Sequence, residues 1–175
     1  MTTATAALDL DALNTMDRAG FVAALGATFE HSPWVAEGAF TARPFRSVDA
    51  LHAAMLAVVA GLPHAQQVAF LNGHPELAGK EAQVGTMTND SVAEQSSAGL
   101  DALSRDEMRE MTRLNAQYRA RHGFPFIVAV RRYSKAQIFD EMRRRIGNPG
   151  EAERAEALAQ IGAITRLRLA RLLPG

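Results

Sequence analysis

Residues 104–123 read SRDEMREMTRLNAQYRARHG and carry the signals of one long amphipathic helix. Ser104 and Glu107 have the spacing of a capping box, in which each side chain satisfies the other residue's backbone amide. Apolar side chains then recur three or four positions apart, at Met108, Met111, Leu114 and Tyr118. His122-Gly123 predicts the end of the helix, because glycine readily adopts the left-handed conformation that closes many helices.

Similar signals on both sides of this helix predict an all-α fold. We expect further helices over residues 14–31, from 32, over 47–61, through 68–71, and over 91–100, 134–146 and 151–173. Trp34 is expected in the core. Residues 77–90 lack a clear period and are expected to be mostly loop. Residues 124–130 predict a buried extended or irregular segment, because a single strand would have no partner.

The length and composition of the chain indicate one folded domain. A chain of 175 residues can bury roughly two-thirds of its unfolded surface around a single core. Hydrophobic residues make up 47% and charged residues 22%, a balance that excludes a disordered protein. We therefore expect residues 1–175 to form a single-domain compact helical bundle, with residues 1–12 as a flexible N-terminal extension.

Charge and cysteine content narrow the possible partners. Acidic and basic residues number 19 each, so no overall field attracts nucleic acid or an anionic membrane. Cysteine is absent, and no histidine pair has the spacing of a metal motif, so we expect no metal. No stretch approaches the ~20 apolar residues of a membrane span, and the N-terminus lacks the features of a secretion signal. We expect a cytoplasmic protein.

His74 is the strongest candidate for proton transfer. In His74-Pro75 the proline suits the first turn of a helix, which would place the histidine ring at a helix N-terminus. That end of a helix favours the neutral imidazole, which can exchange a proton near neutral pH. The alternative is a histidine that only caps the helix or satisfies a nearby carbonyl group.

Glu94 and Arg168 can have structural as well as chemical roles. Ser91 and Glu94 have capping-box spacing, so Glu94 could simply belong to a helix start. The neighbouring Gln95 offers a donor and an acceptor, which suits a ring rich in N–H and C=O groups. Arg168 lies at the edge of an apolar stripe, where its guanidinium can bind a carboxylate or face solvent.

Several motifs in a fixed order resemble those of the 2-oxo-4-hydroxy-4-carboxy-5-ureidoimidazoline (OHCU) decarboxylase family. They are FEHSPW at 29–34, HPELAGK at 74–80, SVAEQ at 91–95, AGL at 98–100 and GFPFI at 123–127. The resemblance covers nearly the whole chain and implies the all-helical fold of that family, usually as a homodimer. It also implies decarboxylation of OHCU to (S)-allantoin in urate degradation.

The resemblance further implies roles for individual residues. His74 matches the catalytic histidine, and Glu94 and Arg168 match positions that complete the active site. Pro75, Ser91 and Gln95 match substrate-contacting positions. The matching pocket wall, whose backbone groups would meet the substrate, consists of Phe126, Ile127, Val128, Ala129 and Val130.

The chemistry of this substrate explains why no cofactor is expected. Its carboxylate lies on a carbon next to a ring C=N, which accepts the electrons left behind by CO₂. The pathway context implies a functional link to urate oxidase and hydroxyisourate hydrolase. One alternative is a catalytically inactive helical dimer of the same fold that binds a ureide or a partner protein. Another is a small all-α decarboxylase of lactone acids, which the ordered motifs fit poorly.

Overall fold

The computed structural model describes residues 8–174, and these residues form helices joined by loops, with no β-strand. The predicted all-α fold is confirmed. By contacts, the chain divides into two compact units, Met1–Pro63 with Thr165–Gly175, and His64–Ile164. Of the predicted N-terminal extension, residues 1–7 lie outside the described residues. Residues 10–12 instead belong to the first helix, which Asp9 caps by accepting a hydrogen bond from the Ala12 amide at 2.7 Å.

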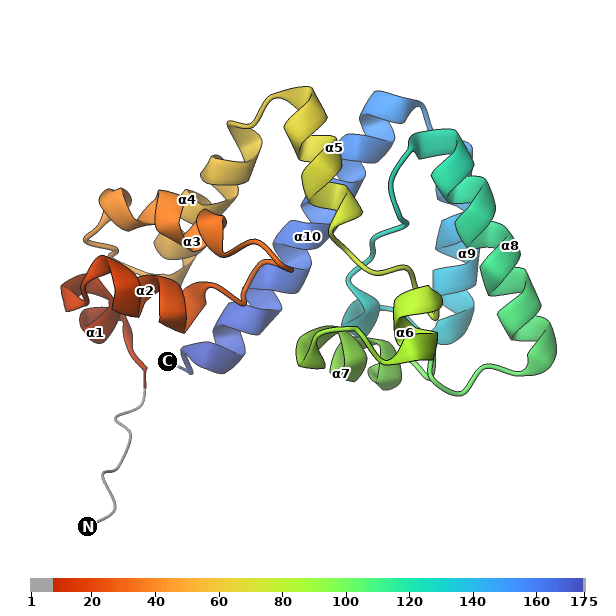
Figure 1. The fold of residues 1–175 in the computed structure, drawn as a ribbon, viewed down its shortest axis with the longest axis horizontal. Helices are drawn as coiled ribbons and strands as arrows, with labels where there is room; N and C mark the ends of the chain where they lie inside the picture. The colour runs from red at the N-terminus through yellow and green to blue at the C-terminus, as the bar shows by residue number, and fades with distance from the viewer. Residues whose placement is uncertain (1–7, 175) are drawn as a thin grey trace, which may run out of the picture. The chain divides into compact units, whose positions relative to one another are not determined.

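The first unit contains α1 (Leu10–Thr15), α2 (Arg18–Leu25), α3 (Pro33–Ala39), the 3₁₀ turn η1 (Phe40–Ala42) and α4 (Val48–Ala60). Helix α3 packs against both α2 and α4 (Figure 1). The continuous helix predicted over residues 14–31 is wrong, because Asp17 starts a new helix by accepting a bond from the Gly20 amide. The core position predicted for Trp34 is also wrong, since this residue is 38% exposed.

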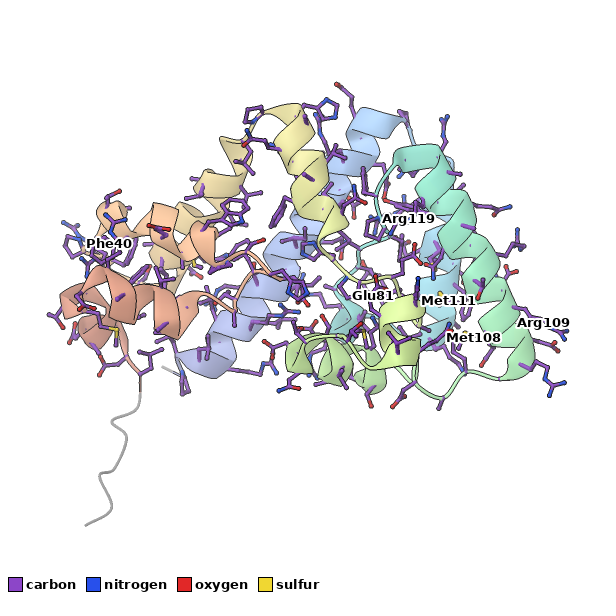
Figure 2. All side chains as sticks on the ribbon, in the orientation of Figure 1. Phe40, Glu81, Met108, Arg109, Met111 and Arg119 are labelled. Carbon is purple, nitrogen blue, oxygen red and sulfur yellow. The ribbon has the colours of Figure 1, made fainter. Side chains whose placement is uncertain are left out.

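The second unit contains α5 (His64–Asn72), α6 (Lys80–Val84), α7 (Asn89–Ser97), α8 (Arg105–His122), the 3₁₀ turn η2 (Val130–Arg132) and α9 (Lys135–Ile146). Helix α10 (Gly150–Leu172) begins in this unit and ends in the first. Helix α8 packs against α9. Met111 lies on the buried face of α8, whereas Arg109 points away from it (Figure 2).

The core of the second unit follows the predicted apolar stripes. The capping box at Ser104 and Glu107 is present, and α8 ends at Gly123, which has a φ of 79°. A second capping box, formed by Ser134 and Gln137, begins α9. The side chains that these two helices bury include Met111, Leu114, Tyr118, Ile138 and Met142. The predicted irregular segment over 124–130 is confirmed, and all of its residues are buried.

In the part of the chain that the structure describes, one pair of helices has the length and composition of a membrane span. No single helix there is long and apolar enough to cross a membrane. Helices α4 and α5 reach the required length and composition only together, as a bent pair.

Candidate active site

His74 lies in the loop that follows α5. Its Nδ1 is 3.2 Å from the carbonyl oxygen of Phe70, and the two rings meet edge to face with centroids 5.2 Å apart. A carbonyl oxygen can only accept, so this contact assigns the proton to Nδ1 and the lone pair to Nε2. Neutral His74 therefore has the tautomer in which Nε2 can act as a base.

The helix start predicted at Pro75 is wrong. Helix α6 begins only at Lys80, so the helix end nearest to His74 in the chain is the C-terminal end of α5. The dipole at that end attracts positive charge, the opposite of the predicted effect. The proline signal fails because the chain first turns into the core. Leu77 is buried there, and Ala78 has a φ of 45°, which no helix can contain.

Helix α8 holds this loop in place. The Arg119 guanidinium donates to the Glu76 carboxylate at 2.8 Å, and Figure 2 labels Arg119 along α8. The Asn115 amide donates to the carbonyl oxygen of Leu77 at 2.9 Å. Gly79 is required because a Cβ there would lie 2.6 Å from the Cβ of Glu76. Most of the HPELAG motif thus fixes the shape of the loop that carries His74.

Gln95 joins the same loop to α7. Its Oε1 accepts from the Ala78 amide at 2.8 Å, and its Nε2 donates to the Glu76 carbonyl oxygen at 3.2 Å. Nε2 also lies 3.3 Å from the sulfur of Met87. Both ends of the amide are therefore engaged within the protein, and a contact with substrate stays a prediction. Pro75 lies in the same loop and is half-buried.

The capping box predicted at Ser91 and Glu94 is wrong. Helix α7 begins at Asn89, and its N-cap is Thr88, whose hydroxyl accepts from the Ser91 amide at 3.3 Å. Ser91 is thus the third residue of the helix, and Glu94 follows one turn later on the same face. Ser91 is buried and Glu94 is half-buried. The capping box therefore does not account for Glu94, and its chemical role stays a prediction.

The predicted pocket wall, residues 126–130, is buried along its whole length. It leads directly into η2, and η2 packs against α7. Two side chains hold its backbone. Arg145 donates to the carbonyl oxygen of Ile127 at 2.8 Å, and Gln160 accepts from the amide of Ala129 at 2.9 Å. The second unit therefore connects three predicted segments, since Gln95 ties the His74 loop to α7 and α7 packs against the turn that ends the wall.

Arg168 belongs to the first unit and already has a carboxylate partner there. The side chain is buried, with NH1 3.0 Å from Oε2 of Glu30 and 3.4 Å from the carbonyl oxygen of Thr28. Glu30 is buried as well. Glu30 belongs to the FEHSPW motif at 29–34, but no role was predicted for it from the sequence. The available signal was an acidic residue directly after Phe29, in a segment otherwise suited to the core.

Sequence reasoning also missed the buried ion pair of Arg145 and Glu153. Both residues are 0% exposed, and Arg145 Nε donates to Glu153 Oε1 at 2.7 Å. The Tyr118 hydroxyl donates to the same oxygen, and burial, reinforced by the hydrogen bond to Glu153, raises the pKa of Tyr118. The signal was the position of Arg145, which continues the apolar stripe of Ile138 and Met142 at i+7 and i+3.

A cavity of about 380 Å³ lies beside α6, α7 and α8, and Gln95 and Ala78 form part of its lining. Its lining is mainly apolar and includes Met87, Val92, Leu100 and Met108. Neither His74 nor Glu94 lines it, so the cavity is not the candidate active site. Among residues 8–174, no group of three His, Cys, Asp or Glu residues is arranged to hold a metal ion.

Comparisons with known proteins agree on one family. The family model for OHCU decarboxylase matches residues 14–170. The chain is 43% identical to the 2-oxo-4-hydroxy-4-carboxy-5-ureidoimidazoline decarboxylase of Haloferax volcanii, over 93% of this chain and 95% of that protein. It is 39% identical to the uric acid degradation bifunctional protein PucL of Bacillus subtilis, over 94% of this chain and 32% of that protein.

A solved structure supports the same assignment. The fold is similar to that in the crystal structure of an (S)-allantoin synthase, with a TM-score of 0.75 and 27% sequence identity. The similarity covers 95% of this chain and 54% of the other. With a family match that includes both of its compact units, the chain belongs to the OHCU decarboxylase family.

Proposed function

We propose that the protein is a cofactor-independent carboxy-lyase that converts OHCU to (S)-allantoin in urate degradation. The match to the OHCU decarboxylase family over residues 14–170 is the observation that carries the proposal. The likeness to the (S)-allantoin synthase structure supports the product and its handedness. The local contacts also support it, because Gln95 ties the loop of His74 to the helix of Glu94.

The proposed reaction requires the loss of CO₂ and the movement of protons. As the bond to the carboxylate breaks, its electron pair moves into the adjacent ring C=N, whose nitrogen takes up a proton. The product is an enol that still carries the substrate hydroxyl. The hydroxyl then loses its proton and becomes a carbonyl, while the neighbouring ring carbon gains one. The substrate supplies the electron sink, so the protein supplies positioning and proton transfer.

His74 and Glu94 are the proposed catalytic residues. With its proton on Nδ1, His74 has a basic Nε2 suited to exchanging protons with the hydroxyl and the ring carbon. Glu94 would orient the imidazole or balance its charge once it is protonated. Proton delivery to a single ring face would give one enantiomer of allantoin.

The proposed substrate-binding residues are Pro75, Ser91, Gln95, the backbone of 126–130, and Arg168. For Arg168 the support is its burial and its pairing with Glu30, which leaves the pair without net charge. A neutral pair suits a contact to the polar ring or ureido group of the substrate. A strong clamp on the leaving carboxylate would instead stabilise the ground state and slow the reaction.

Circular dichroism during a coupled reaction tests the proposed function. Urate oxidase and hydroxyisourate hydrolase generate OHCU in the cuvette, and the signal of (S)-allantoin is followed after addition of the purified protein. The proposal predicts an (S)-allantoin signal whose initial rate is proportional to protein concentration. Only the slow formation of racemic allantoin would contradict it and favour an inactive ureide-binding or partner-binding protein.

The proposed setting is a cytoplasmic homodimer linked to the other enzymes of urate degradation. The bifunctional relative from Bacillus subtilis supports a link to another enzyme of that route. Sedimentation should give twice the 18.9 kDa mass of the chain. We also propose that residues 1–175 act as one domain, which the family match across both compact units supports. Limited proteolysis should then leave no stable fragment that corresponds to one unit alone.

A further inference from the structure

Two side chains fix the backbone on either side of Val128. Arg145 NH1 donates to the carbonyl oxygen of Ile127 at 2.8 Å, and Gln160 Oε1 accepts from the amide of Ala129 at 2.9 Å. A trans peptide group is planar, so its C=O and N–H point in opposite directions. The N–H of Val128 must therefore point away from Arg145, and the C=O of Val128 must point away from Gln160.

Val128 is buried, yet its backbone groups are not used by the protein. The residue is 3% exposed, and neither its N–H nor its C=O has a hydrogen-bond partner among residues 8–174. Buried backbone groups in proteins are almost always paired. Together they offer one donor and one acceptor, the complement of a ligand edge in which an N–H adjoins a C=O. A ring amide and a ureido group both have such an edge.

The buried polar contacts around Arg145 are more numerous than stability alone requires. Arg145 and Glu153 are fully buried, and Glu153 also accepts from Tyr118 and, at 2.9 Å, from Asn148. The Arg145 guanidinium lies 4.5 Å above the centre of the Phe126 ring, so it contacts the wall segment twice. Apolar residues can often replace a buried ion pair without loss of stability. A role in orienting the segment accounts for the polar groups.

We propose that Gln160 and the Arg145–Glu153 pair are positioning residues, which set the N–H and C=O of Val128 to bind the ring-amide or ureido edge of the substrate. The inference rests on the proposed function and deepens it. None of the three side chains needs to touch the substrate. They act on the reaction only by fixing the peptide groups of the wall. Substitutions that remove these contacts should therefore weaken substrate binding and lower the enantiomeric excess of allantoin.

Gln160 gives the sharpest test because it is only half-buried, and its Oε1 meets the Ala129 amide while its Nε2 meets Glu156 and Tyr133. Gln160→Met removes the acceptor for the Ala129 amide, whereas Gln160→Glu keeps an acceptor oxygen there. Glu156→Gln is the matched control, since it alters the partner of Gln160 Nε2 at 2.9 Å and leaves the Ala129 contact intact. KM, kcat and the enantiomeric excess of allantoin are measured for each variant, together with the unfolding temperature and hydrogen exchange of the Ala129 amide.

The expected result is a KM raised roughly tenfold in Gln160→Met, as the loss of one hydrogen bond implies, with a lower enantiomeric excess and faster exchange at Ala129. Glu156→Gln should remain within about threefold of wild type, and so should Gln160→Glu combined with Glu156→Gln, in which no second carboxylate faces the new one. If Gln160→Met matches Glu156→Gln in KM and enantiomeric excess while wild type is active, the positioning role is overturned. A wild type without any enantioselective rate would overturn the proposed function, and this inference with it.

Discussion

The N-cap of α7 is Thr88 and not Ser91. Because Thr88 caps the helix, Glu94 lies outside the capping box that its spacing with Ser91 suggests. The sequence alone could not reveal this. Residues 88–91 read TNDS, four consecutive residues that all form good N-caps, and only the backbone shows which one is used.

Glu94→Gln therefore tests a role in catalysis and leaves the N-cap of α7 in place. We expect the rate of (S)-allantoin formation to fall by about 100-fold, because the carboxylate charge that supports proton transfer is removed. The free energy of unfolding should fall by less than the loss of the helix cap would cost, about 1 kcal/mol, because Glu94 does not cap α7. Urea unfolding and the coupled assay measure the two effects.

Thr88→Ala is the matched control for Glu94→Gln. It should lower the free energy of unfolding by about 1 kcal/mol through loss of the cap and leave kcat near the wild-type value. The reverse pattern, an active but destabilised Glu94→Gln protein, would restore Glu94 to a structural role.

His74 illustrates a different limit of sequence reasoning. Proline is frequent at the first position of helices, and the pair His74-Pro75 therefore predicted a helix start. The structure starts the helix at Lys80, because the burial of Leu77 and the positive φ of Ala78 take the chain through a turn first. His74 stays a candidate, but the helix N-terminus predicted beside it is replaced by the C-terminal end of α5 as the nearest helix end in the chain.

Elements with both a cap and an apolar stripe were predictable. Ser47 before α4, Ser104 before α8 and Ser134 before α9 each cap the helix that the sequence assigns to them. The pattern fails where an additional cap interrupts a stripe, as at Asp17 between α1 and α2. It also fails in α6, which has only five residues and buries none of them.

The N-terminus of α8 should make the protein sensitive to acid. Lys135 lies 2.8 Å from the Glu107 carboxylate, and its hydrogen bond, followed by that of the Ser104 amide, holds the pKa of Glu107 below its usual range. A lowered folded-state pKa gives stability that is present above the unfolded value of about 4.5 and is lost as pH falls through the folded value.

Glu107→Gln tests this contribution. Relative to wild type, the variant should be less stable at pH 7, and the difference should shrink as the pH falls below about 4.5. Urea midpoints of both proteins from pH 3 to pH 7 measure the effect. A difference that stays constant with pH would show that the charge of Glu107 does not contribute. Because Arg113 and Arg144 lower the pKa of Glu110 and Glu141 in the same direction, only the difference between the two proteins is informative.

The pairing of buried charges is the part of the whole molecule that the sequence does not reveal. Arg168 and Glu30 are 138 positions apart, and Arg145 and Glu153 belong to different helices. Periodicity places each residue on a helix or in a loop, but no local rule states which buried charge meets which. The resemblance to a family predicted a functional role for Arg168, and the structure shows its carboxylate partner, Glu30.

A double-mutant cycle tests how the buried Arg145–Glu153 pair contributes to the free energy of unfolding. Arg145→Met alone should lower the free energy of unfolding by about 3–5 kcal/mol, because Glu153 is left as a buried charge without its partner. The double variant Arg145→Met with Glu153→Met should regain part of that loss, because no buried charge remains while the Tyr118 hydroxyl and the Ile127 carbonyl stay unpaired. Urea unfolding measures both, and a double variant no more stable than the single one would contradict this account.

The role of His74 in enantioselective decarboxylation is the central claim, and circular dichroism of the coupled reaction tests it most directly. Wild type, His74→Ala and the control His64→Ala, which alters an exposed histidine in α5, are compared at equal concentration. Wild type and the control should give a rapid (S)-allantoin signal, while His74→Ala should fall by at least about 100-fold, toward the racemic background. A folded His74→Ala protein that forms (S)-allantoin at the wild-type rate would contradict the account.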